Sequence, residues 1–397
     1  MLRTSGRHGS GVRILASSRQ DGERIAANCH AWLTSLGIPR AAVHTASEAS
    51  AVVLELTPTY ADAWLPEGDT LGLAERLGLA SRRNPADLEH EILVAMLGSP
   101  QAFEFPHLGE FESAVRMRRQ IVESARRTRI EFRTLEAERP EAYWYYDEDR
   151  GFCLRPGTSL IDGLVQATQP DASGRLYSFS CWRATEYIAL LAIAREAAEV
   201  HPELLRRMTR QAETRALKAA AFENAYLRKH GSQQTPLPPT YFVPGDRTWF
   251  RNPEPISADV TGYEGSFTFY LGAGEFADFW RPGLTYTLTT KCLTIFHWRN
   301  AVVRDSAGEN AIDETLVELH VAESLRDPSA MAAILQEMVR VQDPPDVFGG
   351  GCIEPTRESP RFVGRLTEDL QLPDAGPLVP PSQTVGCESV HATKSPA

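Results

Sequence analysis

The chain has 397 residues, of which 42% are hydrophobic and 23% charged, as in an ordinary soluble globular protein. Its net charge of -11 disfavours nucleic acid unless a local basic patch exists. The densest basic stretch follows a helical pattern interrupted by acidic residues, and we interpret it as a solvated face: Arg116, Arg118, Arg119, Arg126, Arg127 and Arg129. No apolar run approaches the ~20 residues that span a membrane. We therefore expect the protein to bind neither nucleic acid nor a membrane.

Six cysteines are spread along the chain, and no two form a C-x-x-C pair: Cys29, Cys153, Cys181, Cys292, Cys352 and Cys387. Their spacing supports neither a zinc cluster nor a disulfide framework in a chain of this length. The first 20 residues lack the apolar core of a secretory signal. We therefore expect reduced thiols and a cytoplasmic location.

In chain order, residues 1–50 are predicted to be an N-terminal extension, partly disordered, with a short helix at 24–36. Residues 51–56 (AVVLEL) predict a strand, residues 87–97 a helix, and residues 108–139 the clearest amphipathic helix. Aromatic residues 142–146 and residues 152–154 predict a hairpin around a turn. A short helix is expected at 160–167.

A short alternating strand at 176–180 and a helix at 182–200 are predicted to meet at Cys181. Further on, we expect a helix at 204–229, strands at 248–250, 266–271 and 285–298, and a helix near 328–339. Residues 51–345 would form the catalytic domain. Residues 346–397, rich in Pro, Gly and Ser, are predicted to be a disordered tail.

Cys181 has the strongest chemical context of the six cysteines. The positive end of a helix favours the thiolate, the reactive form of cysteine. Backbone N–H groups of the first helical turn point the same way and can hold an oxyanion. Because most free cysteines are small buried residues, spacing alone leaves the core interpretation open.

The segment Tyr177-Ser178-Phe179-Ser180-Cys181, followed by a hydrophobic helix, resembles the nucleophile segment of the spore-coat type bacterial protein-glutamine gamma-glutamyltransferases. Downstream, Gly245-Asp246 and then Trp249-Phe250-Arg251-Asn252-Pro253-Glu254 resemble that family's G-D and N-P-E segments. The resemblance runs from about Val52 to about Gly283.

This resemblance implies an α/β (α+β) fold with a papain-like core. It implies that a cysteine attacks the carboxamide of a protein glutamine, releases ammonia and passes the acyl group to a protein lysine. The cross-link would form without calcium or any other cofactor. Protein substrates bearing Gln and Lys are the expected partners, and a spore coat is the expected location if the organism sporulates.

The sequence departs from the family pattern around the cysteine. The residue before it is Ser180 instead of a glutamate. Counting forward from Glu254 puts the family's essential glutamate at Gly265, whereas counting back from the end of the strand puts it at Ser266. The nearest carboxylate is Glu264, two residues from Ser266, which keeps the alternation of a strand. We therefore propose Glu264 as the base, with a solvated edge glutamate as the alternative.

The family's histidine after F-A is Asp278 here, following Phe276-Ala277. Aspartate can orient a group or accept a proton, but it cannot reproduce a neutral imidazole. The nearby His297 lies in an apolar run and is expected to be a satisfied core residue. Asp246 belongs to a Gly-Asp turn pair and can simply shape that turn.

The candidate site is therefore Cys181 with Glu264 and Asp278, without a metal. The first hypothesis is a protein cross-linking acyltransferase. A cysteine amidase or deamidase would form the same thioester but use water as acceptor. The altered partners also leave open a non-catalytic coat or binding protein.

Overall fold

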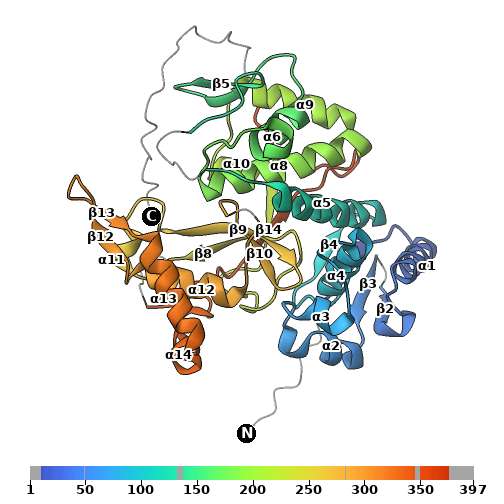
Figure 1. Cartoon of the computed structure of the whole chain (residues 1–397). Coiled ribbons are helices and arrows are strands. Elements are labelled where there is room, and N and C mark those ends of the chain that lie inside the picture. Colours follow the sequence, from blue (N-terminus) through green and yellow to red (C-terminus); the bar gives the residue numbers. More distant parts are fainter. Residues whose placement is uncertain (1–9, 49, 132–136, 282, 345–348, 375–397) are drawn as a thin grey trace.

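The structure is a computed structural model that describes residues 10–48, 50–131, 137–281, 283–344 and 349–374. The first part of the chain forms a four-stranded sheet in which β1 pairs parallel to β4 and antiparallel to β3 (Figure 1). In spatial order its strands are β2 (Val43–Ser47), β3 (Ala51–Leu56), β1 (Val12–Leu15) and β4 (Phe103–Phe105). Helix α1 (Arg19–Ser35) joins β1 to β2, and its N-cap Ser18 accepts a hydrogen bond from the Asp21 N–H.

Residues 10–48 belong to the folded body, which corrects the prediction of an extension over residues 1–50. Val12, Ile14 and Cys29 are completely buried in the main hydrophobic core. Strand β1 has four residues, and its partners β3 and β4 lie far along the chain. Such non-local pairing leaves little local signal in the sequence. Residues 1–9 lie outside the described residues.

A helical region follows, with α5 (Leu108–Arg127) at its base (Figure 1). The predicted amphipathic helix thus ends at Arg127 instead of residue 139, and residues 132–136 lie outside the described part. The hairpin is confirmed as β5 (Trp144–Asp147) and β6 (Gly151–Leu154). Helices α2 (Pro58–Trp64), α3 (Leu73–Leu77) and α4 (Pro85–Leu97) precede β4 and lie beside the first sheet (Figure 1). The helices that follow α5 are α6 (Leu160–Thr168), α7 (Pro170–Ser173), α8 (Cys181–Val200), α9 (Pro202–Thr214) and α10 (Ala220–Tyr226).

A six-stranded antiparallel sheet carries the other half of the fold. Its strands in spatial order are β11 (Thr285–Tyr286), β10 (Glu275–Ala277), β9 (Gly265–Gly272), β8 (Arg247–Arg251), β14 (Arg357–Pro360) and β7 (Leu227–His230). On β9, Phe269 and Leu271 join the core formed with α5 and α8, whereas Tyr270 joins a second core against α12 (Leu288–Trp298). The alternation of β9 therefore puts α8 and α12 on opposite faces of one strand.

Three predicted elements differ in the structure. The expected strand at 285–298 is the short β11 followed by helix α12, and the expected helix at 204–229 divides into α9, α10 and β7. Part of the predicted tail, residues 349–374, is placed, because β14 pairs with both β7 and β8. Residues 345–348 and 375–397 lie outside the described residues.

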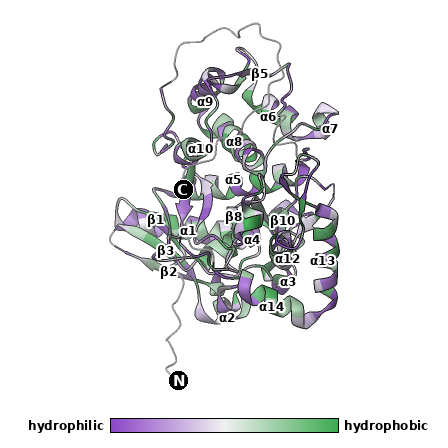
Figure 2. Cartoon of the chain, turned by 90° about the vertical axis from the view of Figure 1, so that its left-hand side faces the viewer, coloured by the Kyte–Doolittle hydropathy of each residue, from purple (hydrophilic) through white to green (hydrophobic). Residues whose placement is uncertain are grey.

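The remaining elements lie around α12, next to the second core. They are α11 (Pro255–Ala258), the hairpin of β12 (Val302–Arg304) and β13 (Asn310–Ile312), α13 (Glu314–Arg326) and α14 (Pro328–Met338). Hydrophilic and hydrophobic stretches are mixed along the helices (Figure 2). Within the described ranges, no helix combines the length and apolar character needed to cross a bilayer. The predicted mixture of helices and sheet is confirmed, and the helix that begins at Cys181 packs on β9 of the antiparallel sheet.

Candidate active site

Cys181 is the first residue of α8, so the predicted position of the thiol at a helix start is confirmed. The segment before it is extended but is not a full strand: the Glu131 N–H donates to the Tyr177 carbonyl, and the Phe179 N–H donates to the Glu131 carbonyl, both at 3.0 Å. Ser180 caps α8 by accepting from the Arg183 N–H at 3.3 Å. Where the family has a glutamate, this chain therefore has a residue that stabilises the helix start.

The Cys181 thiol lies against strand β9 on the sheet side of α8. Burial raises its pKa, while backbone N–H groups of Phe267 and Trp182 and the positive charges of Lys291 and Arg247 act in the opposite direction. Two backbone donors and two cations thus favour the thiolate against the cost of desolvation. Burial is the largest of these influences, so the pKa of the thiol lies above its usual value and ionisation near neutral pH requires a proton acceptor.

Lys291 comes to this site from α12, on the opposite face of β9. It is 3% exposed, and its Nζ donates to Ser266 Oγ at 2.8 Å and lies 4.2 Å from the centre of the Tyr286 ring. Burial lowers its pKa from 10.5 to about 8. Sequence reasoning missed Lys291 because it assigned residues 285–298 to a strand; the available signal was a lone lysine inside an apolar run.

Asp278 follows β10 and is buried on the Lys291 side of the site. Its carboxylate accepts from the backbone N–H groups of Trp280 and Arg281 and from the Arg281 side chain at 2.7 Å. Its negative charge favours the protonated form of Lys291. The structure therefore brings four residues together near the start of β9: Cys181, Ser266, Asp278 and Lys291.

Glu264, predicted as the base, does not join this group. It precedes β9, its side chain is exposed, and its carboxylate accepts from the Gly262 N–H at 3.0 Å within its own turn. Ser266, to which the count back from Leu271-Gly272 points, is buried and accepts a hydrogen bond from Lys291. The one residue by which the two counts differ falls between Glu254 and Ser266.

The two downstream motifs shape the site without touching the thiol. Gly245 adopts φ +88°, and a Cβ there would lie 2.8 Å from the Arg118 backbone. Asp246 forms a buried ion pair with Arg118 at 2.7 Å and accepts from the Val243 N–H. This pair anchors the start of β8 to α5.

The N-P-E segment organises the connection from β8 to β9. The Asn252 side-chain amide donates to Ser257 Oγ and to the Tyr263 carbonyl, both at 2.9 Å. Glu254 caps α11 through the N–H groups of Ile256 and Ser257. The motif therefore fixes where β9 begins and, with it, the position of Ser266.

Other predicted groups have structural roles. His297 is buried, as predicted, although on a helix: its Nε2 lies 2.8 Å from Ser324 Oγ and its Nδ1 2.9 Å from the Asn300 amide. Members of the basic stretch pair within the chain, Arg116 with Glu196 and Arg119 with Glu89. In the described part, no group of three or more His, Cys, Asp or Glu side chains could hold a metal ion.

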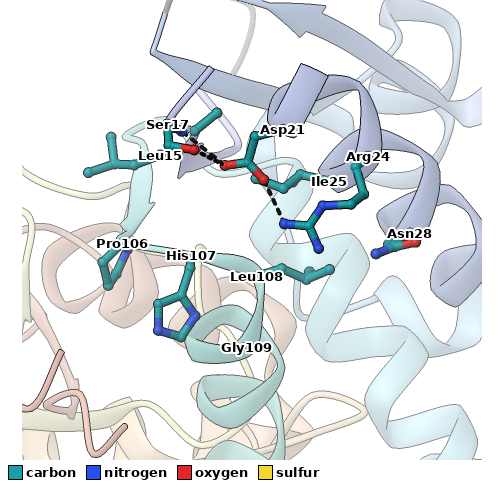
Figure 3. Close-up of a pocket in the computed structure, with 11 residues that line it drawn as sticks. Leu15, Ser17, Asp21, Arg24, Ile25, Asn28, Pro106, His107, Leu108 and Gly109 are labelled. Carbon is teal, nitrogen blue, oxygen red and sulfur yellow. Dashed lines mark hydrogen bonds and ion pairs between the residues drawn. The ribbon is translucent and has the colours of Figure 1, made fainter. Parts of the chain in front are cut away.

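A cavity of about 490 Å³ lies elsewhere, between α1 and the start of α5 (Figure 3). Its lining includes Asp21, whose carboxylate binds Ser17 and Arg24. None of the residues around the thiol lines this cavity, so its size does not identify the reactive site. The residues around Cys181 instead locate the candidate reactive site next to the start of β9.

A thiol at a helix start, with backbone donors and a buried lysine, has the features of a cysteine-nucleophile protein. The family model of protein-glutamine gamma-glutamyltransferase matches residues 74–299, and the chain belongs to this family. A solved transglutaminase from Geobacillus stearothermophilus, without its C-terminal extension, is similar at 18% identity with a TM-score of 0.37, over 54% of this chain and 98% of that one. No curated protein matches the chain.

Proposed function

We propose that the protein is an active protein-glutamine gamma-glutamyltransferase with Cys181 as nucleophile. The Cys181 sulfur attacks the carboxamide carbon of a protein glutamine, and ammonia leaves as the thioester forms. A lysine amine of a second protein then attacks the thioester, giving a glutamyl-lysine isopeptide bond. The observation that carries this proposal is the position of Cys181 at the start of α8 with backbone N–H groups at its sulfur.

The surroundings of the thiol fit this chemistry. Of the five cysteines that the structure describes, Cys181 is the one that is not fully buried. The N–H groups of Trp182 and Phe267 are suitably placed to hold the oxyanion of a tetrahedral intermediate. The rings of Trp182 and Trp249 flank Phe267, with ring centres 5.2 and 4.6 Å from it, and give an apolar wall for a glutamine stem.

Gly265 keeps this wall close to the strand. A Cβ at this position would lie 2.3 Å from the Trp249 ring, so any side chain there would displace the aromatic group. Trp249 and Phe267 face each other across the β8–β9 pairing. The register of these strands therefore sets both the aromatic wall and the backbone donor at the thiol.

The test is the incorporation of a fluorescent primary amine into casein. Wild-type protein should label casein, Cys181→Ala should abolish the label, and the matched Cys153→Ala, at a buried cysteine, should retain it. Labelling that survives Cys181→Ala would refute the assignment. Release of ammonia without amine incorporation would assign a deamidase, and a thiol inert to iodoacetamide would assign a non-catalytic member.

The finer features of the proposal follow from the same family. Activity is expected to persist in EDTA, because the proposed reaction needs neither calcium nor another cofactor. Its substrates would be proteins bearing accessible Gln and Lys side chains. The reduced cytoplasm, or the spore coat of a sporulating organism, would keep the Cys181 thiol available.

A further inference from the structure

Lys291 is an unusual lysine in this chain. The other lysines that the structure describes, Lys218 and Lys229, are exposed, whereas Lys291 is 3% exposed. A buried ammonium is costly unless it is well paired, and the Lys291 ammonium donates its hydrogen bond to a neutral hydroxyl, Ser266 Oγ, at 2.8 Å. Apart from His297, the other buried residues of α12 are apolar: Leu288, Cys292, Leu293, Ile295 and Trp298.

A continuous path of contacts joins Lys291 to the thiol. Lys291 holds the side chain of Ser266, and the next residue, Phe267, directs its backbone N–H at the Cys181 sulfur. Lys291 and Cys181 also act on each other electrostatically: each favours the charged form of the other. Ser266 occupies one of the two positions where the sequence pattern places the family's glutamate.

We propose that Lys291 is the proton acceptor that activates Cys181, in place of the carboxylate expected at Ser266. The inference rests on the proposed acyl transfer. The neutral Lys291 amine takes the thiol proton, and the thiolate attacks the carboxamide carbon. The Lys291 ammonium returns this proton to the nitrogen that leaves as ammonia. In the second half, Lys291 removes a proton from the attacking amine, and the thiolate departs and is reprotonated.

Asp278 acts through Lys291. Its carboxylate favours the ammonium and opposes burial, which is the larger influence and lowers the Lys291 pKa to about 8. A lysine with this pKa exchanges its proton near neutral pH, as a general base requires. The titratable and charged groups that face Lys291 from the surrounding elements are Cys181, Asp278, Arg281, Tyr286, Glu314 and Cys352.

The experiment measures the alkylation of Cys181 by iodoacetamide between pH 6 and 10, with the modified residue located by peptide mass. For wild-type protein the rate should rise through about pH 8. Lys291→Met should slow alkylation at pH 8 by about 100-fold, within the range of general-base effects, and move the inflection to higher pH. Lys218→Met, at an exposed lysine, should leave the profile unchanged.

Lys291→Arg separates proton transfer from electrostatic attraction, because arginine keeps the charge but does not accept a proton. It should remain much slower than wild type, because the retained charge favours the thiolate but cannot accept its proton. A wild-type rate in this variant would overturn the proposal. Adding Ser266→Glu to Lys291→Met should restore part of the alkylation rate, because it puts a carboxylate base where the family pattern has its glutamate. Unchanged alkylation in Lys291→Met would also overturn the proposal.

Because alkylation does not depend on acyl transfer, the two proposals can fail separately. Wild-type protein that alkylates in a Lys291-dependent manner but incorporates no amine would refute the cross-linking function and support the role of Lys291. Circular dichroism of Lys291→Met should match that of wild type, so that slow alkylation reports the chemistry and not unfolding.

Discussion

Lys291 on α12 donates a 2.8 Å hydrogen bond to Ser266 on β9, at the residue next to the backbone N–H that meets the Cys181 sulfur. This hydrogen bond joins α12 to the residue of β9 that precedes Phe267, whose N–H meets the thiol. Helices α8 and α12 pack on opposite faces of β9, so this contact relates two cores of the protein. Several consequences for stability and reactivity can be measured.

Lys291→Met should stabilise the protein at neutral pH. Folding lowers the Lys291 pKa from 10.5 to about 8, so burying the ammonium at pH 7 costs on the order of 3 kcal/mol. Part of this gain is offset by the lost bond to Ser266, and we expect a net increase of about 1 to 3 kcal/mol in the free energy of unfolding. Urea unfolding at pH 7 measures this change in the free energy of unfolding. A variant clearly less stable than wild type would contradict the prediction.

The wild-type stability should also depend on pH with a definite sign. Between about pH 8 and 10.5 the unfolded chain binds a proton at Lys291 that the folded chain does not. This group therefore makes the protein more stable as pH rises through that window. Comparing urea midpoints of wild type and Lys291→Met across the window isolates the contribution, which the variant should lack.

Asp278→Asn should shift the alkylation profile of Cys181 to lower pH. Removing the carboxylate removes the charge that favours the Lys291 ammonium, so the neutral amine appears at a lower pH. We expect a shift of about one pH unit, typical of one nearby charge. Asp259→Asn, at an exposed aspartate near α11, is the matched control and should leave the profile in place.

Glu264→Gln should change amine incorporation by less than about twofold, because its carboxylate is exposed and bound within its own turn. The amide oxygen of glutamine can still accept from the Gly262 N–H. A loss comparable with that of Cys181→Ala would restore Glu264 as the base and remove the need for Lys291. The casein assay with equal amounts of folded protein decides between them.

Asp246→Ala should lower the free energy of unfolding by about 3 to 5 kcal/mol, the usual cost of leaving one member of a buried ion pair without its partner. Arg118 would lose its 2.7 Å partner while remaining 2% exposed. The double variant with Arg118→Met should recover part of the stability, because no charge is left unpaired. If Asp246→Ala unfolds at the wild-type urea concentration, the anchoring role of the Gly245-Asp246 pair is wrong.

The sequence predicts the helix that begins at Cys181 because its start is marked by a small polar N-cap and its length by a long helical pattern. It fails at α12, where buried Leu288, Cys292, Leu293 and Ile295 look like a strand, and where the only local helix signal is the Thr287–Thr290 capping box. That single error hid Lys291. Glu264 was selected by nearness in sequence, but the turn before β9 leaves it in solvent.

The order of strands in the large sheet has a consequence for synthesis. Strand β14 lies between β8 and β7, although more than 100 residues separate it from β8 along the chain. Its Glu358 pairs with Arg247, one of the cations that act on the thiol. A chain emerging from the ribosome therefore exposes Cys181 long before the strand that completes its electrostatic surroundings. The charges around the Cys181 thiol reach their final arrangement only after residues 357–360 have been added, because Arg247 gains its Glu358 partner at that point.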